Sequence, residues 1–400
     1  EVMTMSVAAN IVTLPVVVWY FSDVSLVAVL SNIVVVPFVN FLFIGSFFLA
    51  VAGSISPPVA MALGFLLGTL SNSILAVVKQ LASLPYATIA LPRPHTMLIV
   101  YYYLAIYALW MLSQRKKAPE MKVLLSCVCL LAVSFCVMQY WNTDALRLEF
   151  INVGQGDSCM VRLPNRRHIL VDTGEKGTGT TNNVVDYLKK RGIYSLDCVY
   201  ISHADSDHSG GLEEVLNNIH VKKVALPELN IRSEDMEKLI QMIQQYQVPI
   251  ELVSAGDTYQ VEGLEIKALW PIALSGSSTL VTDNNMSMVL RMTYQDMTAL
   301  FMGDLGGEAE EMLVHSGTPL LCTILKVSHH GSSTGTGDAF LNAAWPKYSV
   351  ISVGENTYGH PDPEVVGRLE SHGSKILRTD VLGNIVFRMD RKGQIVAESR

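Results

Sequence analysis

The chain has 400 residues, of which 50% are hydrophobic and only 16% are charged, and its mean hydropathy is +0.32. An ordinary soluble chain carries about a quarter charged residues, so this composition excludes a disordered, collagen-like or plainly soluble protein. The average hides a division. Residues 1–140 carry six basic and three acidic side chains, which leaves a net charge of −10 for the rest of a chain whose total is −7. The two parts are suited to different solvents.

The first 140 residues contain about five apolar runs. A membrane-spanning helix needs roughly 20 apolar residues, whereas a signal peptide has a single short apolar region. We therefore predict a polytopic α-helical membrane region over 1–140. Because the sequence starts with Glu1 and enters an apolar run at once, we expect it to be part of a longer membrane protein. The runs cover residues 2–20, 24–52, 58–83, about 95–113 and 123–140.

Asparagine and proline residues interrupt these runs. In lipid a side-chain amide needs a hydrogen-bonding partner, so it faces either a helix bundle or a wet cavity. Asn32, Pro37 and Asn40 form the best candidate for a broken or re-entrant element, because proline removes a backbone donor in mid-helix. Asn32 and Asn40 are thus pore-lining candidates, with helix packing as the alternative. The tyrosines at 101–103 fit either an interfacial belt or packing.

The orientation of the membrane part follows from one short loop. Four basic residues, Arg115, Lys116, Lys117 and Lys122, lie between the last two apolar runs. Cytoplasmic loops are enriched in Lys and Arg, so we expect this loop in the cytoplasm. The last helix then carries the chain outward, which predicts an extracytoplasmic location for residues 145–400.

After a short linker at 141–146 the pattern changes to short β-rich segments alternating with helical ones. Such a sequence predicts a single α/β domain over residues 147–400. Strands are expected at 147–153, 158–163, 168–171, 197–201, 221–226, 286–294, 297–302, 323–328, 348–353 and 375–378, and helices near 181–191, 210–218, 232–246, 306–316 and 362–372.

Potential metal ligands are concentrated where one predicted strand ends. Strand 197–201 is followed within a few residues by His203, Asp205, Asp207 and His208, and then by Gly-Gly at the start of a helix. One tetrahedral ion that keeps an open position needs fewer ligands than this. The set suits two ions close together.

Two later strands end on residues of the same kind. Strand 297–302 leads to Asp304, and strand 323–328 leads to His329 and His330. A carboxylate can bridge two cations and an imidazole can complete one coordination sphere. Each group alone is a weak signal, but three strand-end groups in one α/β chain predict a shared site.

These residues resemble known families. HADSDHSGG is similar to the HxHxDH signature of the metallo-β-lactamase superfamily, with Asp205 where that pattern has its second His. Asp172 in LVDTG resembles the early strand-end Asp of that superfamily, and Asp304 resembles its bridging Asp. The resemblance implies an αββα sandwich with a dinuclear site at one edge. The motifs FINVGQGDSCMV, ILVDTG, FMGDL, LKVSHHGS and NTYGHPDP, after a polytopic region, resemble more narrowly the ComEC family of competence DNA-uptake proteins.

The resemblance implies the ligand sets. The first ion would be held by His203, Asp205 and Asp304, together with Asn284 or Asn285, because asparagines stand where the superfamily has another His. The second ion would be held by Asp207, His208 and Asp304, with either His329 or His330. This oxygen-rich set favours two divalent ions of manganese over zinc and leaves both open.

Residues beside the ligands have expected roles as well. Asp172 is expected to orient His203 or His208. His360 is a candidate to donate to a phosphate or to protonate the leaving oxygen, with a structural loop role as the alternative. We expect Asp157 to shape the hairpin beside the site, and Lys326 either to neutralise phosphate or to lie on a solvated face.

The family resemblance implies a function in natural transformation. The membrane part would conduct single-stranded DNA, and the external domain would be a metal-dependent hydrolase that cuts the other strand of a duplex. Membrane lipid and other DNA-uptake proteins are the expected partners, with no expectation for the oligomeric state. The net charge of −10 opposes strong DNA binding, which normally uses Lys and Arg. The alternatives are an inactive domain that only guides DNA to the pore, and a membrane-tethered hydrolase of a small anionic ester.

Overall fold

The computed structural model describes residues 2–84, 87–113, 118–141, 146–177, 184–230, 233–272, 282–389 and 395–399. The chain divides into two compact units, one of Glu1–Ser134 with Lys189–Gly192 and one of Phe135–Leu188 with Ile193–Arg400. Three of the four basic residues that predict the orientation, at 115–117, lie outside the described residues, as does most of the expected linker.

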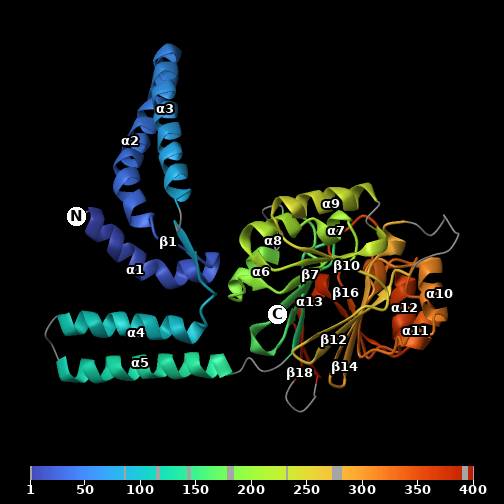
Figure 1. Cartoon of the computed structure of the whole chain (residues 1–400). Helices are drawn as coiled ribbons and strands as arrows, with labels where there is room; N and C mark the ends of the chain where they lie inside the picture. Colours follow the sequence, from blue (N-terminus) through green and yellow to red (C-terminus); the bar gives the residue numbers. More distant parts are fainter. Residues whose placement is uncertain are drawn as a thin grey trace. The chain divides into compact units, whose positions relative to one another are not determined.

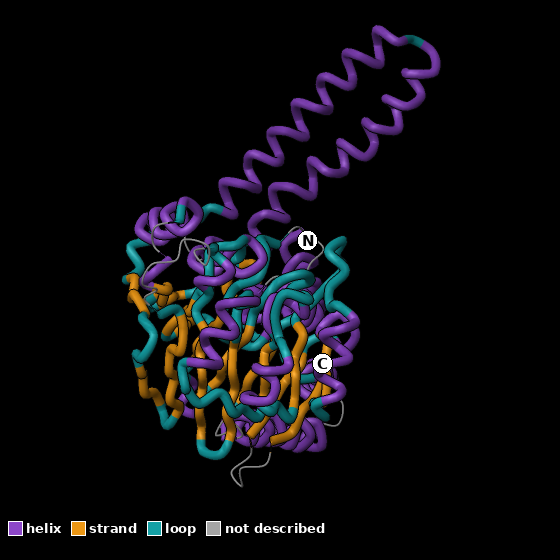
Figure 2. Tube along the Cα trace, turned by 90° about the vertical axis from the view of Figure 1, so that its right-hand side faces the viewer, coloured by secondary structure: helices purple, strands orange, loops and turns teal. Residues whose placement is uncertain are grey.

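The first unit is helical. Its helices are α1 (Val2–Phe21), α2 (Ala28–Ile55), α3 (Pro57–Ala82), α4 (Thr96–Ser113) and α5 (Ala118–Trp141), and the short strands β1 (Asp23–Ser25) and β2 (Thr88–Ala90) pair antiparallel. Helices α2 and α3 form a long hairpin (Figures 1 and 2). Among the described residues, four helices are long and apolar enough to cross a membrane: α1, α2, α3 and α4. In α5 the stretch with described side chains, Lys122–Val137, is apolar as well.

Helix α2 runs without a break through Pro37. The expectation of a break at Pro37 is therefore wrong: proline removes one hydrogen bond, and the rest of this long helix is kept. The amide of Asn32 donates to the hydroxyl of Ser6 on α1 at 3.0 Å, which is a helix-packing contact. Asn40 lies exposed on α2.

A second proline explains the role of the tyrosines. Pro15 lies inside α1 and has no N–H to donate to the carbonyl of Ile11, four residues earlier. The hydroxyl of Tyr102 on α4 donates to that carbonyl at 2.6 Å, and the hydroxyl of Tyr103 donates to Val12 at 2.9 Å. These tyrosines therefore join α4 to α1 where α1 lacks its own hydrogen bond.

The second unit contains two large sheets. The described strands of the first sheet follow the order β10 (Ile250–Val253), β9 (Val224–Pro227), β7 (Cys198–Tyr200), β5 (His168–Val171), β4 (Cys159–Arg162), β3 (Arg147–Phe150), β18 (Ile385–Met389) and β19 (Ile395–Ser399). Strands β5, β7, β9 and β10 pair in parallel, and the others pair antiparallel.

The second sheet has the order β11 (Thr258–Val261), β12 (Leu264–Trp270), β13 (Val289–Tyr294), β14 (Met297–Phe301), β15 (Ile324–Lys326), β16 (Tyr348–Ile351) and β17 (Lys375–Arg378). Its strands β14 to β17 are parallel. Because parallel strands bring their carboxyl ends to one edge of a sheet, the segments that follow β14, β15 and β16 gather at that edge.

Apolar side chains from both sheets form the central core. Phe150 of β3 stacks on Phe301 of β14 with ring centroids 5.9 Å apart, and both are buried. A second core lies between the first sheet and helices α6 (Val184–Lys190), α8 (Leu212–Asn218) and α9 (Glu234–Gln245). A third lies between the second sheet and helices α10 (Gly307–His315), α11 (Asp338–Ala344) and α12 (Pro363–Ser371). The expected αββα sandwich is confirmed (Figure 1).

Helix α9 shows how the sequence sets these layers. The hydroxyl of Ser233 caps its start by accepting from the backbone N–H of Met236 at 3.1 Å, as N-cap serines do. Met236, Leu239 and Ile243 follow at helical spacing and are buried, while the opposite face is charged. Such an amphipathic helix covers a sheet with one side and faces water with the other.

Candidate metal centre

The first sheet supplies half of the centre. After β7 the chain places His203 and Asp205, and the short helix α7 (Ser206–Ser209) carries Asp207 and His208. His203 and His208 are fully buried, whereas the side chain of Asp205 is 41% exposed. The strand-end motif therefore points two imidazoles inward and leaves one carboxylate at the opening.

The second sheet supplies the other half. Asp304 follows β14, and the turn η4 (Ser328–Gly331) follows β15 with His329 and His330. Both histidines have positive φ, 48° and 53°. A non-glycine residue held there costs about 1–3 kcal/mol, and such strain is concentrated at functional sites. The turn uses this backbone to direct both rings to Asp304.

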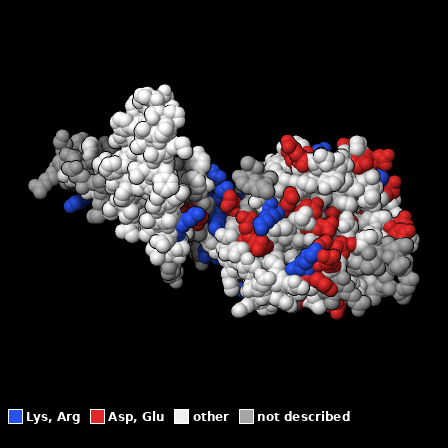
Figure 3. Space-filling view, turned by 90° about the horizontal axis from the view of Figure 1, so that it is seen from above, with Lys and Arg blue, Asp and Glu red and all other residues white. Residues whose placement is uncertain are grey.

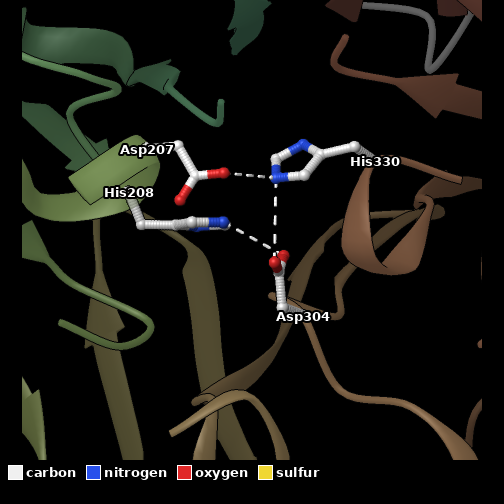
Figure 4. Close-up of side chains that lie close together, drawn as sticks. All are labelled: Asp207, His208, Asp304 and His330. Atoms are coloured by element: carbon white, nitrogen blue, oxygen red, sulfur yellow. Dashed lines mark ion pairs between the residues drawn. The ribbon is translucent and has the colours of Figure 1, made fainter. Parts of the chain in front are cut away.

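Four side chains meet at the middle of the site (Figure 4). His208 Nε2 lies 3.0 Å from Asp304 Oδ1, and His330 Nε2 lies 3.1 Å from Asp207 Oδ2. His330 Nε2 is also 3.7 Å from Asp304 Oδ2. One ligand atom from each of these four residues lies within 4.8 Å of all the others, which is the compactness that a single cation requires.

The remaining predicted ligands lie around Asp304. His203 Nε2 is 4.0 Å from Asp304 Oδ2 and 3.5 Å from Asp205 Oδ2, and His329 Nε2 is 3.6 Å from Asp304 Oδ2. Asp304 thus has histidines from both halves at its two oxygens. This is the central position that a carboxylate bridging two cations would occupy.

The chemistry of the buried atoms fits cations. The Nε2 atoms of His203, His208 and His330 and Oδ1 of Asp304 are buried without any hydrogen bond of acceptable geometry. Buried polar atoms in proteins almost always have hydrogen-bonding partners. Here the nearest neighbours of these atoms are other ligand atoms, 3.0 to 4.0 Å away, an arrangement that fits a cation among them. Divalent cations would supply what these atoms lack, so the residues of this site fit metal binding.

The carboxylates set the protonation of the rings. Burial disfavours the imidazolium of His208, but the charges of Asp304 and Asp172 outweigh burial and raise the pKa of His208 well above 6.5. Burial lowers the pKa of His330 too, but the charges of Asp304 and Asp157 raise it, and the net result is a raised pKa. The buried carboxylates thus favour the protonated form of both rings.

Asp172 lies directly behind the ligands. It follows β5 with a positive φ of 57°, and its Oδ2 is 3.0 Å from His208 Nδ1. It also accepts from the backbone N–H of Ser202 at 2.7 Å and from the Ser202 hydroxyl at 2.9 Å. The structure pairs Asp172 with His208, and it reaches His203 through Ser202, whose Oγ is 3.0 Å from His203 Nδ1.

Asp157 and Lys326 form a buried pair that sequence reasoning missed. Both side chains are less than a tenth exposed, and their charged groups are in direct contact. The Asp157 oxygens also lie 3.5 Å from His330 Nδ1 and 3.7 Å from His208 Nδ1. Lys326 is therefore not on a solvated face, and Asp157 contributes charge to the site in addition to shaping its turn.

The structure does not bring Asn284 and Asn285 to the site. They lie in the turn η3 (Asn284–Met286), where the carbonyl of Asn285 accepts from Trp270 Nε1 at 2.6 Å. Among the described residues, neither amide contacts the histidine and aspartate cluster. Neither asparagine is among the residues that line the cleft over this centre, and their assignment as ligands stays a prediction.

A cleft of about 990 Å³ opens over the centre. Asp205, Asp207, Asp304, His329, His330 and His360 are among its lining residues. His360 is half-buried, with its ring centroid 5.6 Å from that of His329. Burial and the neighbouring rings of His329 and His330 lower the pKa of His360. It therefore lies at the wall of the cleft, next to the candidate ligands.

Comparison with known families agrees with this geometry. Residues 1–116 match the model described as Competence protein, and residues 151–355, slightly more than half of the chain, match that of the metallo-beta-lactamase superfamily. The chain belongs to the metallo-beta-lactamase superfamily. Its N-terminal match confirms the resemblance to competence DNA-uptake proteins, and with four helices of spanning length it is a multi-pass membrane protein.

Two curated relatives have names from the same field. ComE operon protein 3 of Bacillus subtilis (strain 168) is 28% identical over 97% of this chain and 52% of its own length. Competence protein ComA of Neisseria gonorrhoeae is 35% identical over 60% of this chain and 32% of its own length. The chain thus spans a third to a half of these relatives. Among solved structures, CmlA from Streptomyces venezuelae matches 61% of this chain and 54% of its own, with 13% identity and a TM-score of 0.44.

Proposed function

We propose that the α/β unit hydrolyses phosphodiester bonds of DNA with the help of divalent cations, and that it does so while the membrane part takes up the other strand. The observation that carries the proposal is the set of unpartnered, buried ligand atoms of His203, His208, His330 and Asp304. The second support for the proposal is the match of residues 1–116 to the model described as Competence protein.

The side chains divide the work of holding two cations. His203, Asp205 and Asp304 form one set, and Asp207, His208, Asp304 and His330 form the other, with His329 beside Asp304. Two such cations, manganese or zinc, would supply a water deprotonated near neutral pH and would neutralise charge on the phosphate. The chain's own contribution is to fix the ligands: Asp172 holds the ring of His208 by its Nδ1 atom.

His360 is placed to act on the phosphate. Its lowered pKa keeps it neutral near pH 7, so it serves as a hydrogen-bonding partner of the phosphate or leaving oxygen and not as a fixed cation.

For the membrane part we propose a channel for single-stranded DNA, with residues 145–400 on the extracytoplasmic side. This order suits the chemistry, because the second strand must be removed before a single strand enters. Other DNA-uptake proteins are the partners that a competence function requires. A double substitution of Asn32 and Asn40 by Leu tests the channel lining: reduced DNA uptake with normal expression supports it, and normal uptake leaves Asn32 as the packing residue its bond to Ser6 indicates.

The nuclease proposal is tested by cleavage of labelled DNA by the purified chain in manganese and in zinc. Asp207→Ala removes a central ligand and is expected to abolish cleavage, whereas Asp296→Ala, which removes an exposed carboxylate in the turn between β13 and β14 that does not line the cleft, serves as the matched control. Lack of cleavage with both metals would refute the nuclease and favour a domain that only guides DNA.

A further inference from the structure

The cleft over the centre has the wrong charge for holding DNA by its backbone. Seven carboxylates are among its described lining residues: Glu175, Asp205, Asp207, Glu213, Asp235, Asp304 and Glu355. The basic lining residue, Lys238, is paired with Glu234 and Asp235 at 3.0 Å each. On the face of the α/β unit drawn in Figure 3, acidic side chains likewise prevail over basic ones. Two divalent cations offset only part of this charge, so phosphate contacts alone are a poor source of affinity.

An aromatic side chain at the wall of the cleft offers another source of affinity for DNA. Tyr358 is 74% exposed although it lines the cleft. Its ring is stacked on that of His360, with centroids 5.8 Å apart and planes 29° apart. His360 in turn contacts the ring of His329. One face of the Tyr358 ring therefore packs against His360. Since His360 contacts His329, a candidate ligand, two ring–ring contacts connect Tyr358 to the centre.

The loop that carries this pair is fixed by one residue. The side chain of Asn356 accepts from the backbone N–H groups of Tyr358 and His360 at 3.1 and 3.0 Å. Its amide donates to the carbonyls of Gly354 and His360, both at 2.9 Å. These four hydrogen bonds fix the backbone that carries Tyr358, and the stack on His360 is the contact that orients its ring. Preorganised aromatic groups bind at a low entropic cost.

We propose that the supported ring of Tyr358 stacks on an unpaired nucleobase next to the scissile phosphate, so that the substrate of the centre is single-stranded DNA and not intact duplex. The inference rests on the proposed nuclease function and specifies its substrate. Stacking suits an acidic cleft because it needs no cation, and every base has a face to offer. In a duplex those faces are covered by neighbouring bases, whereas an unpaired strand exposes them.

Binding is measured with the full chain in detergent and manganese, using a fluorescein-labelled phosphorothioate 12-mer of thymidylate that resists cleavage. Stacking of one base on an aromatic ring is worth roughly 5- to 150-fold in affinity. Tyr358→Ala is expected to weaken binding within that range and Tyr358→Phe to preserve it. Trp345→Ala, which removes an exposed ring elsewhere on the α/β unit, is the control and is expected to bind normally.

An abasic oligonucleotide separates stacking from a general loss of the fold. The wild-type chain should bind it as weakly as Tyr358→Ala binds the normal 12-mer, and Tyr358→Ala should not distinguish the two. Equal binding of normal and abasic strands by the wild-type chain, or duplex bound as tightly as single strand, overturns the proposal. Cleavage of unmodified DNA is measured separately. If Tyr358→Ala leaves cleavage unchanged, only the stacking proposal is refuted. If stacking is observed but no metal supports cleavage, only the nuclease proposal is refuted.

Discussion

The buried pair of Lys326 and Asp157 gives the sharpest test of how the site is built. Lys326→Met keeps the length of the side chain and removes its charge, which leaves the Asp157 carboxylate buried without its cation. Removing one partner of a buried ion pair costs about 3–5 kcal/mol. The rings of His330 and His208, 3.5 and 3.7 Å from Asp157, supply part of the missing charge. We therefore expect the low end, about 3 kcal/mol.

This loss is measurable by thermal unfolding in EDTA, followed by the fluorescence of buried Trp270 in the third core. A domain of this size loses roughly 2–4 °C in Tm per kcal/mol, so Lys326→Met should melt about 6–12 °C lower than the wild-type chain. Asp157→Asn should lose a similar amount because it strands the ammonium group. The double variant removes both charges and should recover most of the loss, since a buried pair replaced as a unit is often neutral.

The refuting results are a Lys326→Met chain within about 0.5 kcal/mol of the wild type, or a double variant whose loss equals the sum of the single losses. Additivity means that the two residues do not interact. Either result would show that this pair is solvated in solution and does not support the centre from behind.

Three further predictions concern the centre and the core. Asp172→Asn should weaken manganese binding about 10- to 100-fold in calorimetry because it loosens the ring of His208, and unchanged affinity would contradict its orienting role. Because the pKa of His208 is raised, the stability that this residue adds to the metal-free protein is complete below about pH 6.5 and is lost as the pH rises through the raised pKa. A midpoint of urea unfolding in EDTA that increases over this pH range would contradict this prediction. With manganese the trend should reverse, since ligands must lose protons to bind. Phe150→Ala should cost about 3–5 kcal/mol in urea unfolding, since it removes the stacking partner of Phe301; a loss below 1 kcal/mol would place little of the core's energy there.

The strand-end argument recovered most of the centre from sequence. His203 and His208 follow β7, Asp304 follows β14 and His330 follows β15, and parallel strands bring such ends together whatever the details of the loops. The choice between His329 and His330 could not be made, because it depends on the positive φ angles of a four-residue turn. The assignments of individual ligands remain predictions.

The misses have physical causes. Lys326 looks like a solvated lysine in sequence because its partner lies on the other sheet, and nothing local reports a buried counter-ion. Asn285 is expected to replace a ligand because of its position in a sequence pattern, whereas it is not among the residues that line the cleft. Pro37 predicted a break in α2 from local propensity, but a 28-residue helix tolerates the loss of one bond. For Lys326 the deciding contact is tertiary, whereas for Pro37 the deciding factor is the length of its own helix.

The centre draws its ligands from two separate sheets, and this has a consequence for the fold itself. A cation held by Asp207 from one layer and Asp304 from the other would cross-link the two layers of the sandwich, and without it only the histidines stand between these two carboxylates. Metal binding and the docking of the layers are therefore linked, and linkage is reciprocal. A substitution in the shared core, far from any ligand, should lower the affinity for metal, and excess metal should restore the stability that it loses, by about 4 kcal/mol at a thousandfold excess over Kd. When metal is scarce, the first structural effect expected is therefore separation of the two layers of the sandwich.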